Sequence, residues 1–194
     1  MKVLSAIAGI IATNYQMSIQ GAEEFTAGLI FGLIGKDDLP ELQKCLQNSE
    51  ALEQEITNAI SDLSKGDLQD IIKAVQEIGQ IVRELPADLQ DCQNIQGDVT
   101  KITTWAKQFA NPVTLVTKLT QNLLANWKTI QTDVTQTSTD YTAAKYEACG
   151  EDVADIVVLS LGKISHAEDI ANLKALSAQN NMFLFWVNLS LNSP

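Results

Sequence analysis

The sequence predicts an all-α protein, a bundle of about five to seven helices with one long threonine-rich helix. Three observations lead to this fold class. Only 10 glycines and 4 prolines occur in 194 residues, which leaves few turns and favours long helices over many short strands. Apolar residues recur every three to four positions along most of the chain, as they do on one face of a helix. Because 45% of the residues are hydrophobic, the chain can bury a core as one domain, which excludes a wholly disordered protein.

The first element is an apolar segment at the N-terminus. Lys2 is followed by an uncharged apolar run, residues 3–12, which is too short to span a bilayer and has the length of the hydrophobic part of a secretory signal peptide. We therefore expect a signal peptide over residues 1–21, with cleavage after Gly21 or after Ser18. The alternative is an ordinary apolar helix at the N-terminus.

The next stretch, residues 22–35, is nearly all apolar. Four glycines in and beside it fall within about 60° of one another on a helix: Gly21, Gly28, Gly32 and Gly35. A helix face without side chains allows another helix to approach closely. The alternative is a flexible apolar segment that is buried against the rest of the bundle.

Two helices are expected after this stretch, over about residues 40–64 and 68–85. Gly66 supplies a stop for the first, and Asp67 an N-cap for the second. The second helix has apolar residues in a strict heptad: Leu68, Ile71, Val75, Ile78, Val82 and Leu85. Such a pattern is typical of a core or coiled-coil face rather than of a cofactor site.

Pro86 and Pro112 are each predicted to open a further helix, because proline is tolerated in a first helical turn. The helix from Pro112 meets no other proline or glycine before Gly150, so we expect it to run as far as Cys149. Twelve threonines lie between residues 100 and 142. Threonine is a poor helix former because of its branched side chain, so this long helix needs packing within the bundle or with another molecule.

The chain beyond Gly150 is expected to continue with a sixth helix over residues 153–164, for which a strand is the alternative. A capping box at residues 165–168 predicts a short final helix. Residues 179–194 form an apolar tail that is too short to span a membrane, and we expect it to dock into the bundle, into lipid or onto a neighbouring copy. Asn188 begins a glycosylation sequon within this tail.

Cysteine spacing predicts one disulfide. Cys45 and Cys92 each follow a Leu-Pro helix start by about a turn and a half. The second predicted helix is about 31 Å long from Cys45 to Gly66, and the third is about 27 Å long. If they form an antiparallel hairpin, both cysteines lie near the same end of it. We therefore predict a Cys45–Cys92 disulfide, with two buried free cysteines as the alternative. Cys149 is left as a free thiol or as a partner for a cysteine of another chain.

The charge distribution separates the chain into three parts. The formal net charge is −11 and the pI is about 4.4, which argues against a nucleic-acid partner because phosphate contacts need clustered Lys and Arg. Residues 22–98 carry a net charge of −11, residues 99–145 carry +3, and residues 146–194 carry −4. A positive middle between acidic flanks can pair within the bundle or between copies. The alternative is a chance imbalance on solvated helix faces.

No catalytic, metal or cofactor site is predicted. His166 is the single histidine, so sites that need a pair of histidines are excluded. Glu147, Glu151 and Asp155 have a spacing that aligns them on one helix, but Gly150 is expected to interrupt that helix. We interpret them as a solvated acidic face rather than as ligands of a cation.

Short motifs at turns and helix ends support a resemblance. They are Glu24-Phe25 with Gly28 and Gly32, Lys65-Gly66-Asp67-Leu68, Glu84-Leu85-Pro86, and Gly150-Glu151-Asp152-Val153-Ala154-Asp155. On these motifs, the stretch from Glu23 to Ile164 resembles an uncharacterised family of secreted, all-helical proteins of single-celled eukaryotes. The resemblance implies helices and secretion, and it transfers no catalytic residue.

Together these observations predict a signal peptide (residues 1–21), a helical domain (22–178) and an apolar tail (179–194). The predicted function is that of a secreted, extracellular, non-enzymatic protein that self-associates into an oligomer or filament through amphipathic helices. Its expected partner is another copy of itself. The alternative is a lipid-binding or lipid-carrying helical bundle.

Overall fold

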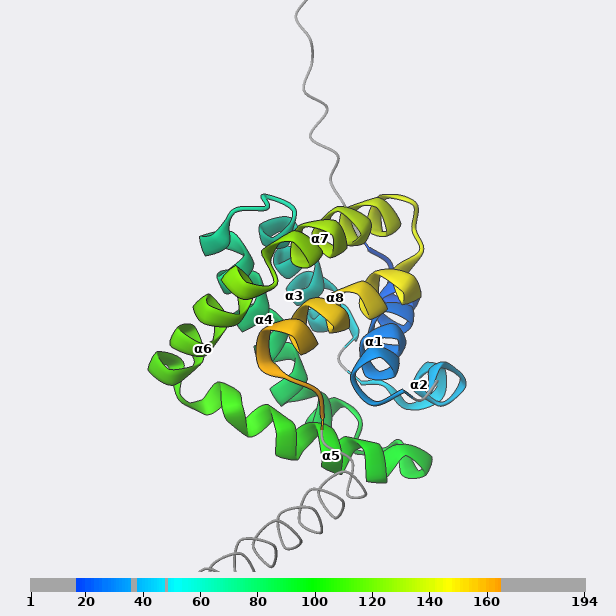
Figure 1. Ribbon diagram of the computed structural model, residues 1–194. Coiled ribbons are helices and arrows are strands. Elements are labelled where there is room, and N and C mark those ends of the chain that lie inside the picture. The colour runs from blue at the N-terminus through cyan, green and yellow to red at the C-terminus, as the bar shows by residue number, and fades with distance from the viewer. Residues whose placement is uncertain (1–16, 36–37, 48, 165–194) are drawn as a thin grey trace, which may run out of the picture.

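The computed structural model describes residues 17–35, 38–47 and 49–164. In these residues it contains eight α-helices and no strand, which confirms the predicted all-α class (Figure 1). In chain order the helices are α1 (Ile19–Ile34), α2 (Leu39–Cys45), α3 (Ser49–Leu63), α4 (Leu68–Asp88), α5 (Gln96–Ala106), α6 (Pro112–Ala125), α7 (Trp127–Thr142) and α8 (Tyr146–Leu161). Two short 3-10 helices, Gln93–Ile95 and Lys107–Ala110, flank α5. The described part of the chain thus exceeds the predicted five to seven helices, because two predicted helices are each divided.

The first and last described helices, α1 and α8, pack against each other with their backbones in contact. A Cβ atom added to Gly28 would lie 1.8 Å from the carbonyl oxygen of Glu147, and one added to Gly150 would lie 2.1 Å from that of Phe25. Only glycine fits at such a distance. Of the two alternatives for the glycines of residues 22–35, the structure therefore shows the close helix approach, with α8 as the partner.

Gly150 lies inside α8, so the prediction that it interrupts a helix is wrong. The predicted sixth helix begins earlier, at Tyr146, and ends at Leu161. A glycine inside a helix costs about 1 kcal/mol relative to alanine. Here that cost is offset by the packing of α1, which a side chain at this position would prevent.

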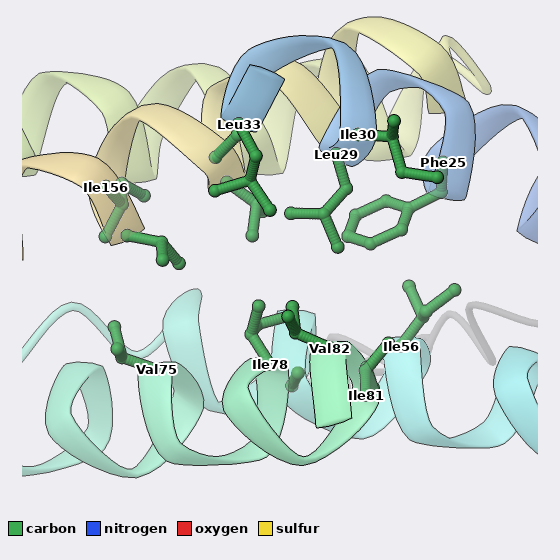
Figure 2. Close-up of a cluster of buried hydrophobic side chains, with 14 of the residues drawn as sticks. Phe25, Leu29, Ile30, Leu33, Ile56, Val75, Ile78, Ile81, Val82 and Ile156 are labelled. Atoms are coloured by element: carbon green, nitrogen blue, oxygen red, sulfur yellow. The ribbon is translucent and has the colours of Figure 1, made fainter. Parts of the chain in front are cut away.

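The hairpin of α3 and α4 follows the sequence prediction closely. Gly66 adopts a positive φ of 75° between the two helices, and the Asp67 side chain accepts hydrogen bonds from Gln69 N and Asp70 N at 2.9 and 3.0 Å. The heptad side chains of α4 face inward. Figure 2 shows hydrophobic side chains of α1 lying opposite those of α4, with contributions from α3 and α8: Phe25, Leu29, Ile30, Leu33, Ile56, Val75, Ile78, Ile81, Val82 and Ile156.

The predicted helix over residues 40–64 is divided into α2 and α3. The chain takes an extended conformation at Leu46, where ψ is 126°, and Gln47 N donates a hydrogen bond to Asp88 O at 3.1 Å. The disulfide at Cys45 also ties the end of α2 to the turn after α4. These long-range contacts end the helix where the sequence carries no proline or glycine.

Pro86 does not open a helix; it lies in the last turn of α4. Leu85 and Leu89 are both fully buried and continue the apolar face of α4. Burial of two leucines contributes about 3–6 kcal/mol, which outweighs the backbone hydrogen bond that proline cannot donate. The next α-helix, α5, begins only at Gln96.

The single long threonine-rich helix is also a wrong prediction, because this region forms α6, α7 and the start of α8. Leu123 in α6 and Ile130 in α7 are fully buried, and a turn at Asn126 lets each helix pack in its own direction (Figure 1). A second turn, with Ala144 at a φ of 55°, separates α7 from α8. Threonine hydroxyls that bond to the preceding turn favour such bends.

Candidate interaction surface

The side of α6 that faces solvent concentrates exposed aliphatic side chains. Of the five large apolar side chains that are exposed in the described residues, three lie on α6: Val113 at 77%, Val116 at 38% and Leu124 at 59%. Thr117 and Thr120 lie between them, and all five positions fall within about 100° around the helix axis. We call Val113, Val116, Thr117, Thr120 and Leu124 the α6 outer face.

The side of α6 that adjoins this face is buried. Leu115, Leu119 and Leu123 are 5% exposed or less and pack in the core. The helix begins at Pro112, where the Asn111 side chain accepts a hydrogen bond from Thr114 N at 3.1 Å. The apolar residues of α6 form one arc of about 180° around the helix axis, and core packing uses only half of it.

Three side chains fix α5 and α6 to the C-terminal end of α8. Asn122 Nδ2 donates to Ser160 O at 2.7 Å, Lys118 Nζ donates to Leu161 O, and Trp105 Nε1 donates to Gly162 O at 3.1 Å. The last carbonyls of a helix have no partner within it, so these side chains supply what α8 lacks. They also hold the α6 outer face in a fixed orientation.

The neighbouring helix α7 presents threonines to solvent. We call Lys128, Thr132, Thr135, Thr139 and Thr142 the α7 outer face; all are exposed. The hydroxyls of Thr132, Thr135 and Thr139 donate to the carbonyls four residues earlier, at 2.8 to 3.1 Å. Their donors are therefore used inside the helix, and the face offers methyl groups and acceptor lone pairs to a partner.

Two shallow hollows lie along α7. The first, of about 590 Å³, is lined by Trp127, Lys128, Gln131, Thr132, Thr135 and Gln136. The second, of about 470 Å³, lies between α7 and the turn from α3 to α4. In the second hollow the hydroxyls of Ser64 and Ser138 are 3.0 Å apart, so the two elements already bond to each other there.

Few charges lie on these two helices. The α6 and α7 outer faces as defined contain a single charged side chain, Lys128. Two other bases of the positive middle segment are paired internally: Lys101 with Asp98 at 2.9 Å and Lys145 with Asp140 at 3.5 Å. Two of the bases of the positive middle segment therefore pair within the bundle, which is one of the two kinds of pairing that the charge distribution suggested.

Carboxylates gather between α7 and α8 instead. The pKa of Asp152 is raised to about 7, first by burial and then by the negative charges of Asp140 and Asp133. Burial, and next the charge of Asp155, raises the pKa of Asp133. Across residues 17–35, 38–47 and 49–164, no three His, Cys, Asp or Glu side chains form a group that could hold a metal ion.

The structure contains the predicted Cys45–Cys92 disulfide, with the two Cα atoms 5.3 Å apart. Cys149 carries a free thiol and is fully buried. Burial raises the pKa of this thiol, as do the charges of Asp152 and Asp140. A thiol so enclosed and protonated is not available to a cysteine of another chain in this fold.

Several predicted features lie outside the described residues. They are the residues of the predicted signal peptide up to position 16, His166, the capping box at 165–168, the apolar tail and Asn188. Sequence reasoning missed the α6 outer face because its apolar residues alternate with threonines and share a helix with buried leucines. The signal that marks it is the width of the apolar side of α6, about 180° around the helix axis.

None of the described helices has the length and apolar character that crossing a membrane requires. A family model described as SctB-like, secreted protein B-like, matches residues 5–161. No curated protein and no solved structure matches the chain. The family match covers nearly the same stretch as the resemblance found in the sequence, and it stops before the apolar tail.

Proposed function

The chain belongs to the SctB-like, secreted protein B-like family, and from this premise we propose that it is a secreted, non-enzymatic protein that self-associates through the α6 and α7 outer faces. The family description supports secretion and does not identify a partner. That the family comes from single-celled eukaryotes remains part of the proposal, because the match names no organism.

The observation that carries this proposal is the exposure of aliphatic side chains on α6. Val113 and Leu124 are 77% and 59% exposed, although the same helix has already buried its other side. An exposed apolar patch with a polar rim is typical of an interaction site. The neighbouring α7 outer face extends the patch with methyl groups whose hydroxyl donors are already bonded.

Charge supports a second copy as the partner. Two chains of net charge −11 repel each other at low salt. The α6 and α7 outer faces lie within the segment of net charge +3, and contact there keeps the acidic parts of both copies apart. Self-association through these faces is therefore less opposed by charge than association through other surfaces.

Burial argues against α1 as part of the proposed surface. This helix is packed into the core against α8, with Phe25, Leu29 and Ile30 fully buried. Association through α1 would require the core to open. The proposed surface therefore rests on α6 and α7.

Secretion through a signal peptide is a separate part of the proposal. Ser18 Oγ accepts a hydrogen bond from Gly21 N at 3.0 Å and caps α1. Cleavage after Ser18 would leave α1 whole but remove its cap, whereas cleavage after Gly21 would also remove the first turn of the helix. N-terminal sequencing of the secreted protein decides between these sites, and a mature protein that begins at Met1 would overturn the signal peptide.

The test of self-association is molar mass by light scattering across protein concentration, at low and high salt. We expect the mass of the full chain to rise with concentration. The double variant Val113→Asp and Leu124→Asp should weaken association at least tenfold, because contact would bury two unpaired charges. The matched control, Gln54→Asp and Gln69→Asp, adds the same charge at exposed positions on other helices and should associate like the unmodified chain.

A chain that stays monomeric at every concentration contradicts the proposal. If that monomer also carries co-purifying lipid, the lipid-binding alternative gains support. In that case the α6 outer face would be the amphipathic surface that contacts lipid.

A further inference from the structure

We propose that the α6 outer face is covered in the monomer by the apolar segment Met182–Leu191 of the same chain, which competes there with a second copy. This inference deepens the proposed self-association, and its regulatory consequence rests on it. Four features of the described residues and the sequence support it.

The first feature is the position where the described chain ends. Ser160 O and Leu161 O accept hydrogen bonds from Asn122 and Lys118 of α6, Gly162 O accepts one from Trp105 of α5, and Ile164 is 4% exposed. The chain therefore leaves the domain between α5 and α6, and a segment that continues it has to pass around α6 to the outer face. Residues 165–181 span about 25 Å as a helix and about 55 Å when extended, so either form allows the segment to reach the α6 outer face.

The second feature is the size of the face. From Val113 to Leu124 the α6 outer face is about 16 Å long and one helix, about 10 Å, wide. Its footprint of about 160 Å² is far below the roughly 800 Å² per partner of a stable protein interface. A segment of ten residues such as Met182–Leu191 is about 15 Å long as a helix, which fits the face, whereas a second copy needs the α7 outer face as well.

The third feature is the matching chemistry of the two surfaces. The segment Met182–Leu191 contains no charged side chain, and neither does the α6 outer face. Contact between them removes apolar surface from water on both sides without leaving a charge unpaired. An acidic or basic segment would not have this property.

The fourth feature is linkage within one chain. A segment joined to its binding face by a linker long enough to span the distance has an effective concentration in the millimolar range. A second copy at micromolar concentration is therefore outcompeted for the α6 outer face until the segment leaves it. The segment would thus set the concentration at which copies associate.

A cysteine-pair experiment on the full chain tests the docking. Val116→Cys is combined with a cysteine at each of residues 183–186 in turn, which samples one helical turn of the segment. The native cysteines do not interfere, because Cys45 and Cys92 are bonded and Cys149 is buried. Under mild oxidation we expect at least one pair to form an intramolecular disulfide tenfold faster than its control, in which the exposed Gln80 of α4 carries the cysteine instead.

Two results would overturn the docking. Equal rates in the α6 and α4 pairs would show that the segment has no preferred site. Disulfides formed only between chains would show that a neighbouring copy supplies the occupant. Peptide mapping and non-reducing electrophoresis distinguish these outcomes from the expected one.

A second measurement separates this inference from the proposed function. Phe183→Asp with Trp186→Asp should release the α6 outer face and tighten self-association at least tenfold. If the intramolecular disulfide forms but no variant alters molar mass, the docking holds and the proposed self-association fails. If copies associate through α6 but no intramolecular disulfide forms, the self-association holds and the docking fails.

Discussion

The pair α1–α8 and the pair α6–α7 use their small residues in opposite ways. Between α1 and α8, glycines bring two backbones into contact, and a Cβ at Gly28 would lie 1.8 Å from Glu147 O. In α6 and α7, threonines bond to their own helix and leave methyl groups toward solvent. The first pair is specified by contacts between two backbones, and in the second pair the core leaves apolar side chains of α6 uncovered.

This contrast indicates which positions of the chain tolerate substitution. Close contact between backbones leaves no room to relax, so a substitution there acts on the whole core. A substitution on an exposed face changes the free energy of unfolding little. On the proposed surface we expect it to change the strength of association instead. Stability measurements and association measurements should therefore respond to different sets of residues.

The largest effect is expected for Gly28→Ala. The added Cβ would clash with the backbone of α8 at Glu147, and because backbone cannot shift easily, we expect a loss of about 5 kcal/mol in the free energy of unfolding, or a failure to fold. Chemical denaturation measures the loss. Gly97→Ala is the matched control: a Cβ there meets no atom within 4 Å, and the change should be neutral or stabilising by up to about 1 kcal/mol. Similar results for both variants would show that the α1–α8 contact is looser than described.

The next effect concerns the disulfide, which ties α2 to the end of α4, while residues 112–142 contain no cysteine. Cys45→Ser with Cys92→Ser removes a cross-link between positions separated by 47 residues. The chain-entropy estimate for that loop is about 4 kcal/mol of stability. Denaturation of the double variant measures this loss. The dependence of molar mass on protein concentration should be the same as for the unmodified chain, because the disulfide lies outside the α6 outer face. A variant as stable as the unmodified chain would contradict the expectation.

Adjacent leucines in α6 sharpen the comparison within one helix. Leu123 is fully buried and Leu124 is 59% exposed. Leu123→Ala should cost about 3 kcal/mol through the cavity it leaves, whereas Leu124→Ala should change stability by less than about 0.5 kcal/mol. Thermal denaturation and light scattering on both variants should give opposite rankings. Equal stability losses would show that Leu124 packs in the core as Leu123 does.

The smallest effect on stability is expected from the titration of Asp152, which lies where α8 of the first pair packs against α7 of the second. The pKa of Asp152 is raised from 3.8 to about 7, so the folded chain holds a proton that the unfolded chain releases between these values. Stability should therefore fall as pH rises from about 4 to about 7 and then level off. The full shift corresponds to about 4 kcal/mol, and because the side chain is partly exposed and screened, we expect about 1–2 kcal/mol.

Asp152→Asn tests this pH dependence directly. The neutral amide should stabilise the chain at pH 8 and have no effect near pH 4, so that the slope between these values decreases. Denaturation at a series of pH values gives the slope. An unchanged slope in the variant would assign the pH dependence to other carboxylates, such as Asp133.

Features that depend on neighbouring residues could be predicted from the sequence. The Gly66 turn, the Asp67 cap, the heptad of α4 and the start of α6 at Pro112 all follow local rules. The predicted disulfide is present although two premises of the prediction are wrong, since α2 is separate from α3 and Pro86 opens no helix. The premise that holds is that the α3–α4 hairpin returns the chain to the end at which α3 begins.

Features set by distant contacts could not be predicted. Gly150 has the appearance of a helix stop, and its role inside α8 becomes clear only when α1 is placed against it. Pro86 is held inside α4 by the burial of Leu85 and Leu89. The α6 outer face is hidden in the sequence for a similar reason, because the sequence does not show how much of one wide apolar side the core covers.

The contact of α1 with α8 also governs the order in which the molecule can fold. Gly28 belongs to the first described helix and Gly150 to the last, and the final carbonyls of α8 are bonded by Trp105, Lys118 and Asn122. A chain that emerges N-terminus first therefore lacks the partner of α1 until nearly all of the domain has been synthesised. Contacts between such distant positions form slowly. The α1 side of the core is therefore completed only when α8 has been synthesised.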